Sequence, residues 1–374
     1  MAHEIWDFPA EVERIPSPAL ICFPDIIEQN IRRMVEIAGR PDRLWVHLKT
    51  VKAPHILRLL QAAGINRFKC ATYAEAEMAG ENSAEYVLWA YPLVGPNIPL
   101  LLDLMHRFPK TKWFALADDP EQIRAIGCAA RQAGREAGLM IDVDLGLHRT
   151  GVSVEGLPAL CRLAMETEGI RLQGIHAYDG HIHATSVEER KALVDAEHNA
   201  LDPVVASLRV EGMPLTWVIW GGTPTFPCHS PYQQADLSPG TCVLHDAGYA
   251  RLYPDLPFRE AAMVLTRVIS HPAADLFTLD LGYKGLAADA DPPRARLIGY
   301  EDADSLFQNE EHWTLRVPKE SLPPAIGQVL YAIPAHICPT VNLYPCYLAV
   351  QHGVVKEQWP IPARNRWIAP LGNR

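Results

Sequence analysis

Between about residue 18 and residue 245, short runs rich in β-branched and aromatic residues alternate with longer stretches of helical periodicity. This alternation predicts a parallel sheet, because two parallel strands need a crossover between them and the crossover is usually a helix. The runs number eight and are Ala19–Phe23, Leu44–Leu48, Phe68–Ala71, Tyr86–Tyr91, Trp113–Ala117, Leu139–Val143, Leu172–His176 and Trp217–Trp220. Eight strands with helical crossovers predict a (β/α)8 barrel that begins near Ala19, with an open doubly wound sheet as the alternative.

The chain changes character after residue 246. Stretches of helical periodicity disappear, prolines become frequent, and short β-rich runs recur. These runs are Met263–Ile269, Leu276–Leu281, Trp313–Val317, Val329–Ile333 and Tyr347–Gln351. They predict an all-β C-terminal domain over residues 246–374, together with residues 1–17, because the first barrel strand begins only near Ala19. The barrel domain is expected over residues 18–245.

Charge and length exclude several classes of protein. The 374 residues carry 34 Lys and Arg against 44 Asp and Glu, a formal net charge of −10. Nucleic-acid binders and polybasic membrane binders need a cationic face, so neither class is expected. The N-terminus lacks the pattern of a secretory signal, and no run of the ~18 apolar residues that span a membrane occurs, so we expect a cytoplasmic protein. The eight cysteines form no Cys-x-x-Cys pair and are expected to be mostly small buried residues.

Two cationic residues follow strands of the expected barrel, where catalytic groups gather at the carboxyl ends. Lys49 follows the second run in the segment HLKTVK. If it is buried, its pKa is lowered, which a Schiff-base lysine needs; a strand-end lysine that extends to solvent is the alternative. Arg149 follows the sixth run in a loop flanked by glycines. Its planar guanidinium suits a phenolate or carboxylate oxygen, although an ordinary surface arginine also fits.

A cluster of histidines follows the seventh run. His176, Tyr178, His181 and His183 lie within eight residues of one another. Histidine changes its charge near neutral pH and therefore serves as acid, base or metal ligand. So dense a cluster indicates a site more often than a surface loop.

Glycines and hydroxyl residues follow the last runs. Gly222 and Thr223 come directly after the eighth run, and Gly240 and Thr241 lie shortly beyond. Barrels of this kind bind phosphate groups here through backbone N–H groups, although each segment alone also fits a turn. A lysine after an early strand, an arginine after a middle strand and a phosphate cradle at the end together predict a pyridoxal phosphate site.

The β domain contains one candidate metal site. His336 and Cys338 are two residues apart in a β-rich run. In a strand this spacing points both side chains to the same face, which suits two metal ligands. The alternative is a packed cysteine beside a hydrogen-bonded histidine.

Sequence blocks spread over nearly the whole chain resemble one known family. In order, the blocks are HLKTVK, KCATYAEAEMA, VDLGLHRTGV, GIHAYDGH, GGTPT, SPGT, LDLGYKGLAAD, NEEH and PAHICPTVNLY. They resemble the fold-type III pyridoxal phosphate enzymes of the D-threonine aldolase and D-serine dehydratase group, relatives of alanine racemase. The resemblance implies an N-terminal barrel, a C-terminal β domain and a homodimer.

The resemblance also implies roles for individual residues. Lys49 would hold the cofactor, Arg149 would approach its ring oxygen, and Tyr178 would lie near the pyridine nitrogen. The phosphate would be held by Gly222, Thr223, Gly240 and Thr241. His336 and Cys338 would bind a divalent metal, for which the cysteine favours Zn²⁺ over Mn²⁺ or Mg²⁺.

Two positions depart from the family pattern. Val51 replaces a second histidine after the lysine, which alters the pocket beside Lys49. Cys242 stands where a tyrosine is more common after Pro-Gly-Thr, so its side chain is not counted among the phosphate contacts.

The resemblance implies a lyase that acts on D-3-hydroxy amino acids. In an aldolase, His181 or His183 removes the hydroxyl proton and the Cα–Cβ bond breaks, which yields glycine and an aldehyde. In a dehydratase, Lys49 removes the Cα proton and the metal-bound hydroxyl leaves, which yields a keto acid and ammonia. The His-x-Cys pair resembles the dehydratase branch. An amino-acid racemase is the alternative function, and it would need a second base but no metal ligands.

Overall fold

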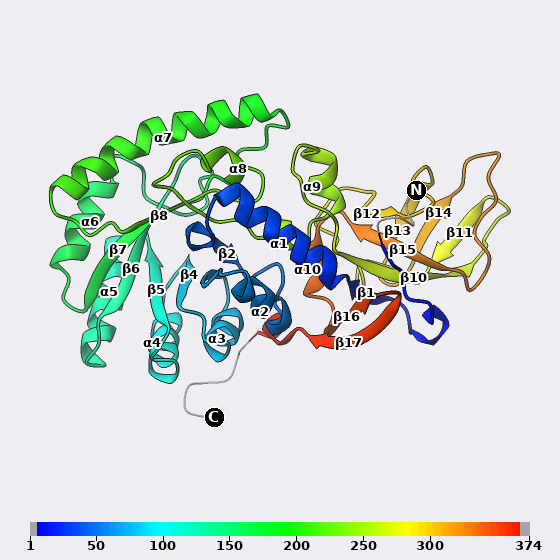
Figure 1. Ribbon diagram of the computed structural model, residues 1–374, viewed down its shortest axis with the longest axis horizontal. Coiled ribbons are helices and arrows are strands. Elements are labelled where there is room, and N and C mark those ends of the chain that lie inside the picture. Colours follow the sequence, from blue (N-terminus) through cyan, green and yellow to red (C-terminus); the bar gives the residue numbers. More distant parts are fainter. Residues whose placement is uncertain (1–5, 367–374) are drawn as a thin grey trace. The chain divides into compact units, whose positions relative to one another are not determined.

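The computed structural model describes residues 6–366, which form two compact units (Figure 1). One unit comprises the described residues up to Arg33, with Thr50–Ile56 and Thr241–Arg364. The other comprises Met34–Lys49, Leu57–Gly240 and, of the described residues, Asn365 and Arg366. These bounds differ from the expected limits of 18–245 and 246–374. The expected limits also include residues 1–5 and 367–374, which lie outside the described residues.

The second unit is the predicted barrel. Eight parallel strands pair in the order β2-β3-β4-β5-β6-β7-β8-β9, and a parallel bridge between Leu44 and Leu237 joins the two ends of the sheet. The strands are β2 (Trp45–His47), β3 (Arg67–Cys70), β4 (Tyr86–Pro92), β5 (Lys112–Ala117), β6 (Ala137–Val143), β7 (Ile170–Ala177), β8 (Trp217–Trp220) and β9 (Asp236–Leu237). The connections carry α2 (Pro54–Ala62), α3 (Tyr73–Glu81), α4 (Asn97–Arg107), α5 (Pro120–Gln132), α6 (Leu157–Glu166), α7 (Val187–Val210) and α8 (Phe226–His229).

Local sequence signals begin several of these helices. Thr72 and Ser186 precede α3 and α7 and accept hydrogen bonds from the backbone N–H groups three residues later. The Asp119 side chain caps α5 by accepting a hydrogen bond from the backbone N–H of Glu121, two residues later, and Pro120 occupies the first helical position. Such caps satisfy backbone donors that the helix itself leaves unpaired.

The first barrel strand is not the one that we expected. β1 (Ala19–Cys22) pairs with β10 and β16 in the sheet of the other unit, so the assignment of Ala19–Phe23 to the barrel is wrong. The eighth barrel strand is instead β9, a two-residue strand in a segment without an apolar run of strand length. Periodicity could not separate these cases, because both a barrel strand and a central strand of another sheet are buried on two faces.

The first unit contains a nine-stranded sheet with the main order β13-β14-β11-β10-β1-β16-β17, and β15 pairs with β10 and β12. Its further strands are β10 (Ala262–Ser270), β11 (Leu276–Leu279), β12 (Ala295–Leu297), β13 (Asp304–Gln308), β14 (Trp313–Arg316), β15 (Val329–Pro334), β16 (Cys346–Gln351) and β17 (Val354–Pro360). Each of the five predicted runs matches one strand, although two of them extend past the ends of β11 and β14 by two residues and one residue. β13 and β17 lacked an apolar signal because most of their residues are exposed.

This unit also contains helices, of which the two short ones were not predicted. α1 (Pro24–Ala38) begins in it, and α9 (Ala247–Leu252) and α10 (Ile337–Val341) are short. α10 corrects the interpretation of the metal motif, because His336 is its N-cap and Cys338 lies in its first turn. Strand periodicity therefore does not bring these two side chains together.

An aromatic cluster fills the barrel at the amino ends of its strands. Trp45, Tyr86 and Trp217 are the first residues of β2, β4 and β8, and their ring centroids lie 5.4–6.2 Å apart. The guanidinium of Arg67, the first residue of β3, lies 5.4–6.0 Å from all three rings. Cation–π contacts and edge-to-face packing stabilise such a cluster. The carboxyl ends of the strands are thus the end at which polar side chains can gather.

None of the helices in residues 6–366 combines the length and the apolar character that a membrane crossing requires.

We predict that Arg43 is needed for barrel closure. Its buried guanidinium, 3% exposed, donates hydrogen bonds of 2.7–3.0 Å to the carbonyl oxygens of Ala38, Ser230, Tyr232 and Ala235. Arg43→Met removes the guanidinium donor from all four oxygens, of which that of Tyr232 keeps a hydrogen bond from Ala235 N, and should destabilise the barrel by about 3 kcal/mol or more. Thermal unfolding followed by circular dichroism measures the change.

The matched control is Arg40→Met, because the side chain of Arg40 is 60% exposed and pairs only with Asp42 among its recorded contacts. Its effect should stay within about 0.5 kcal/mol. Equal melting temperatures for the two variants would contradict the role assigned to Arg43.

Candidate functional site

A chain of hydrogen bonds crosses the barrel near the carboxyl ends of β3, β6 and β7. Lys69 Nζ lies 2.7 Å from His176 Nε2, and His176 Nδ1 lies 2.6 Å from Asp142 Oδ1. An ionised carboxylate only accepts hydrogen bonds, so His176 donates through Nδ1 and accepts from Lys69 through Nε2. Thr150 donates a further hydrogen bond of 2.7 Å to Asp142 Oδ2. The chain is therefore fully paired.

Burial sets the charge states in this chain. Lys69 is 3% exposed, and burial, followed by repulsion from Lys49, lowers its pKa to about 7. Burial and the nearby charge of Lys69 also lower the pKa of His176. Burial raises the pKa of Asp142, but the charge and hydrogen bond of His176 outweigh it and hold that pKa below its usual value. Near neutral pH the amine can thus exist with or without its proton.

Lys49 lies in the turn after β2 and is exposed. The buried lysine with a lowered pKa is Lys69, whereas the expected burial of Lys49 is not observed. The signal for Lys69 was present, because it lies inside the apolar run Phe68–Ala71. We missed it because a lysine within a run gives no hint of whether it faces the barrel interior or the surrounding helices.

Arg149 and Tyr178 lie together beside this chain. The Arg149 guanidinium lies 4.9 Å from the centroid of the Tyr178 ring, and Lys69 Nζ lies 5.7 Å from it. Asp144 orders the Arg149 loop by accepting hydrogen bonds from Gly146 N and His148 N. The structure thus brings the two predicted ring contacts to one place.

Gly151 ends the same loop with a φ of +108°. A Cβ at this position would lie 2.4 Å from Asp144 N, so both the conformation and the close approach require glycine. The loop that carries Arg149 is therefore defined by its backbone.

Three of the four predicted phosphate residues, Gly222, Thr223 and Gly240, lie in the barrel unit. Gly240 N donates a 3.2 Å hydrogen bond to Thr223 Oγ1, and a Cβ on Gly222 would lie 3.1 Å from the Tyr178 ring. Ser238 Oγ is buried and has no hydrogen-bond partner among the described residues. An unpaired buried hydroxyl is costly, so this segment is incomplete without a further polar group. An anion supplies such a group.

Thr241 belongs to the other compact unit, together with the metal motif. Its hydroxyl lies 3.4 Å from Cys338 Sγ, and Thr50 Oγ1 lies 3.1 Å from the same sulfur. His336 and Cys338 are joined by a hydrogen bond, and His336 Nδ1 lies 2.5 Å from Asp289 Oδ2. A carboxylate on one nitrogen of a histidine orients the other nitrogen, which is the usual arrangement around metal-bound histidines. The donor set therefore fits a metal, although α10 replaces the expected strand.

The two candidate general bases have different environments. His183 is exposed, whereas His181 is partly buried and its Nε2 lies 3.4 Å from Glu197 Oε1. His181 Nδ1 is buried without a hydrogen-bond partner in the described chain.

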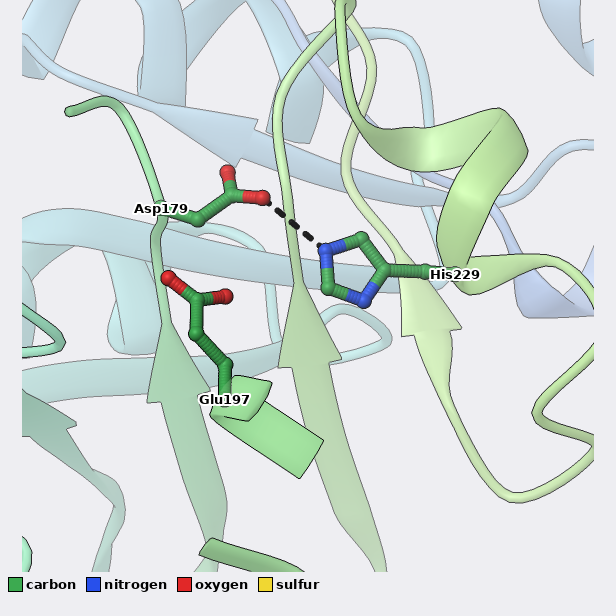
Figure 2. Close-up of side chains that lie close together, drawn as sticks. All are labelled: Asp179, Glu197 and His229. Carbon is green, nitrogen blue, oxygen red and sulfur yellow. Dashed lines mark hydrogen bonds and ion pairs between the residues drawn. The ribbon is translucent and has the colours of Figure 1, made fainter. Parts of the chain in front are cut away.

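Asp179, Glu197 and His229 form a buried group that was not predicted from the sequence (Figure 2). His229 Nε2 lies 2.9 Å from Asp179 Oδ2. Burial, and then the charge of Asp179, raises the pKa of Glu197 to about 9. Asp179 lay inside the histidine cluster of the sequence, but its partners are 18 and 50 residues away, so only the fold brings them together.

Two protein families match the chain. Residues 24–246 match the alanine racemase N-terminal domain, and residues 261–350 match a putative serine dehydratase domain. The two matches follow one another along the chain in the order that the sequence blocks predicted.

Several relatives match over almost their whole length. The chain is 30% identical over 358 residues to D-threonine aldolase from Arthrobacter sp., which covers 94% of this chain and 93% of the relative. It is 25% identical over 369 residues to D-threo-3-hydroxyaspartate dehydratase from Delftia sp. (strain HT23), with 92% and 97% covered. The crystal structure of D-threonine aldolase from Filomicrobium marinum matches with a TM-score of 0.85 and 27% identity over 94% of this chain and 95% of that chain. The chain therefore belongs to the D-threonine aldolase and D-serine dehydratase family of fold-type III pyridoxal phosphate enzymes, with an alanine racemase-like barrel.

Proposed function

We propose that the protein is a lyase that depends on pyridoxal phosphate and a divalent metal and that acts on a D-3-hydroxy amino acid. The observation that carries this proposal is the pair His336 and Cys338, held beside Asp289. A racemase has no use for metal donors at this place, whereas a lyase needs a Lewis acid for the substrate hydroxyl. The products are glycine and an aldehyde if the Cα–Cβ bond breaks, or a keto acid and ammonia if the hydroxyl leaves.

The residues of the barrel fit the cofactor. Lys49 would be its covalent attachment point, Arg149 would face the ring oxygen and Tyr178 would lie beside the pyridine nitrogen. The phosphate contacts are assigned to Gly222, Thr223, Gly240 and Thr241. The unpaired hydroxyl of Ser238 supports an anion beside these residues. When bound, pyridoxal phosphate supplies an electron sink for charge that develops at the substrate Cα.

The chain of Lys69, His176 and Asp142 serves to position Tyr178. The rings of His176 and Tyr178 are nearly parallel, with centroids 6.4 Å apart and an interplanar angle of 16°. Asp142 fixes the orientation of His176, and Lys69 contacts both rings. A rigid ring at this place would exclude water and hold the cofactor plane.

The metal site is assigned to His336 and Cys338. Imidazole and thiolate donors favour Zn²⁺, with Mn²⁺ and Mg²⁺ as alternatives. When bound, the metal supplies Lewis acidity for the substrate oxygen. Asp289 keeps one nitrogen of His336 protonated and leaves the other for the metal.

Proton transfer distinguishes the two reactions. For aldol cleavage, His181 or His183 would accept the hydroxyl proton; the unpaired Nδ1 of His181 favours His181. For dehydration, Lys49 would accept the Cα proton. The homodimer and the cytoplasmic location implied earlier remain predictions.

We predict that Lys49→Ala abolishes the yellow absorbance of the bound cofactor and lowers activity by at least about a hundredfold. The cause is the loss of both the attachment amine and a proton acceptor. Lys191→Ala is the matched control, because Lys191 is exposed on α7 and pairs with Asp195. Equal absorbance in the wild type and Lys49→Ala would remove Lys49 from the site.

We predict that D-threonine is converted by the metal-loaded enzyme and that EDTA stops the reaction. Glycine with acetaldehyde identifies an aldolase, and 2-oxobutyrate with ammonia identifies a dehydratase; both are quantified in one product assay. Cys338→Ala should lose metal and activity, whereas Cys128→Ala, which changes an exposed cysteine, should retain both. Loss of chirality without either product pair would establish the racemase instead.

We predict that Lys69→Met removes a pH-dependent part of the stability of the cofactor-free protein. The folded pKa of Lys69 is about 7, below its unfolded value, so the unfolded chain binds more protons between about pH 7 and pH 10. Wild-type stability should therefore rise relative to Lys69→Met as the pH increases through this window, by at most a few kcal/mol.

Melting temperatures of both proteins across that window measure the difference, in which other titrating groups cancel. Lys110→Met changes an exposed lysine and should run parallel to the wild type. Parallel curves for the wild type and Lys69→Met would show that Lys69 keeps its ordinary pKa.

A further inference from the structure

Three elements of the barrel unit direct acidic and imidazole side chains to one buried point. Asp179 follows β7, Glu197 lies on α7 and His229 ends α8 (Figure 2). The three residues are 1%, 8% and 0% exposed, and one ligand atom from each lies within 4.8 Å of the others. None of these residues has been given a part in the proposed reaction.

A relay of hydrogen bonds defines which atom of His229 faces Asp179. Asp202 Oδ2 lies 2.9 Å from His198 Nδ1, and His198 Nε2 lies 2.9 Å from His229 Nδ1. With neutral rings, His198 donates to Asp202 and accepts from His229 Nδ1. His229 Nε2 then carries a lone pair and faces Asp179 Oδ2 at 2.9 Å. Two lone pairs at this distance repel each other unless a positive species lies beside them.

Glu197 adds a second unbalanced carboxylate. Both of its oxygens are buried, and neither has a hydrogen-bond partner among the described residues. Its carboxylate points toward Asp179 and His229 (Figure 2). His181 Nε2 lies 3.4 Å from Glu197 Oε1. An ionised Glu197 carboxylate that is buried beside Asp179 without a donor is strongly unfavourable, so the cluster needs a proton or a cation at its centre.

We propose that Asp179, Glu197 and His229 bind one divalent transition-metal ion, at a site separate from the His336 and Cys338 motif. Two carboxylates and one imidazole suit Zn²⁺ or Mn²⁺. His198 and Asp202 complete the arrangement, because a metal-bound histidine usually donates its other N–H to a carboxylate or to a group bound to one.

The ion would connect three elements of the barrel unit beside Tyr178. It links the loop that begins with Tyr178 and Asp179 to α7 and to α8. A cavity of about 400 Å³ lined by His181 and Glu197 provides an approach for the ion. The role assigned to this site is structural, since it holds the loop that carries Tyr178 and His181.

The experiment uses the full-length protein carrying His336→Ala and Cys338→Ala, which removes the other metal site. The protein is stripped with a chelator, dialysed against Zn²⁺ and analysed for bound metal by mass spectrometry. We expect one equivalent of Zn²⁺ and a higher melting temperature with Zn²⁺. Adding Glu197→Gln should reduce bound Zn²⁺ at least tenfold and remove the melting-temperature rise.

Glu189→Gln is the matched control, because Glu189 is exposed on the same helix, and it should bind Zn²⁺ like its parent. Glutamine is neutral and similar in size to the protonated Glu197 of the stripped protein, so the stripped form of Glu197→Gln should be at least as stable as the parent. Asp179→Asn provides a second test of the same ligands. Absence of Zn²⁺ from the parent, or equal Zn²⁺ in the parent and Glu197→Gln, would show that protons balance the cluster and would overturn the proposal.

The same measurement separates this site from the proposed function. In the otherwise unchanged chain, Glu197→Gln should lose one metal equivalent of two, and the pair His336→Ala and Cys338→Ala should lose the other. Loss from only one of these variants identifies which of the two assignments is wrong.

Discussion

Closure of the parallel sheet between β2 and β9 is the constraint on which the rest of the barrel depends. The closing strands have only three and two residues, so few backbone hydrogen bonds cross this edge. The Leu44–Leu237 bridge and the bond from His47 N to Pro239 O, 3.0 Å, supply two of them, and Arg43 adds side-chain bonds. In a flat sheet β3 and β7 would lie roughly 19 Å apart across four strand spacings. The 2.7 Å contact between Lys69 and His176 exists because the sheet is closed.

The barrel unit contains two buried charge networks of different kinds. In the first, Lys69, His176 and Asp142 alternate donors with acceptors, so each polar atom finds a partner of opposite character. In the second, the Glu197 oxygens face Asp179 and His229 without a hydrogen-bond partner among the described residues, and the Asp179 carboxylate is paired only with His229 Nε2 among its recorded contacts. The low local dielectric strengthens the hydrogen bonds of the first network, and it raises the free-energy cost of unpaired polar groups in the second. The first network therefore needs nothing further, whereas the second needs a cation or protons.

The parts predicted from sequence were those carried by neighbouring residues. The alternation of runs predicted seven of the eight barrel strands, and the β-rich runs predicted the core strands of the other sheet. Ala19–Phe23 was assigned to the wrong sheet because a buried strand has the same pattern in either place. His336 and Cys338 were expected on a strand but lie at the start of α10, because Cys338, Pro339 and Thr340 continue into a helical turn that β-rich flanking residues hide.

The sequence by itself determined the family and the blocks that carry Lys49, Arg149, Tyr178 and the phosphate segments. Each block consists of neighbouring residues near the end of a strand, so it can be read from a short stretch of sequence. Only the tertiary structure decided which lysine is buried, since exposure depends on the direction in which a strand residue faces. It also decided that Glu197 and His229 meet Asp179, because contacts between residues tens of positions apart depend on how helices pack on a closed barrel. Burial, charge balance and hydrogen-bond direction are properties of that packing, and no local pattern contains them.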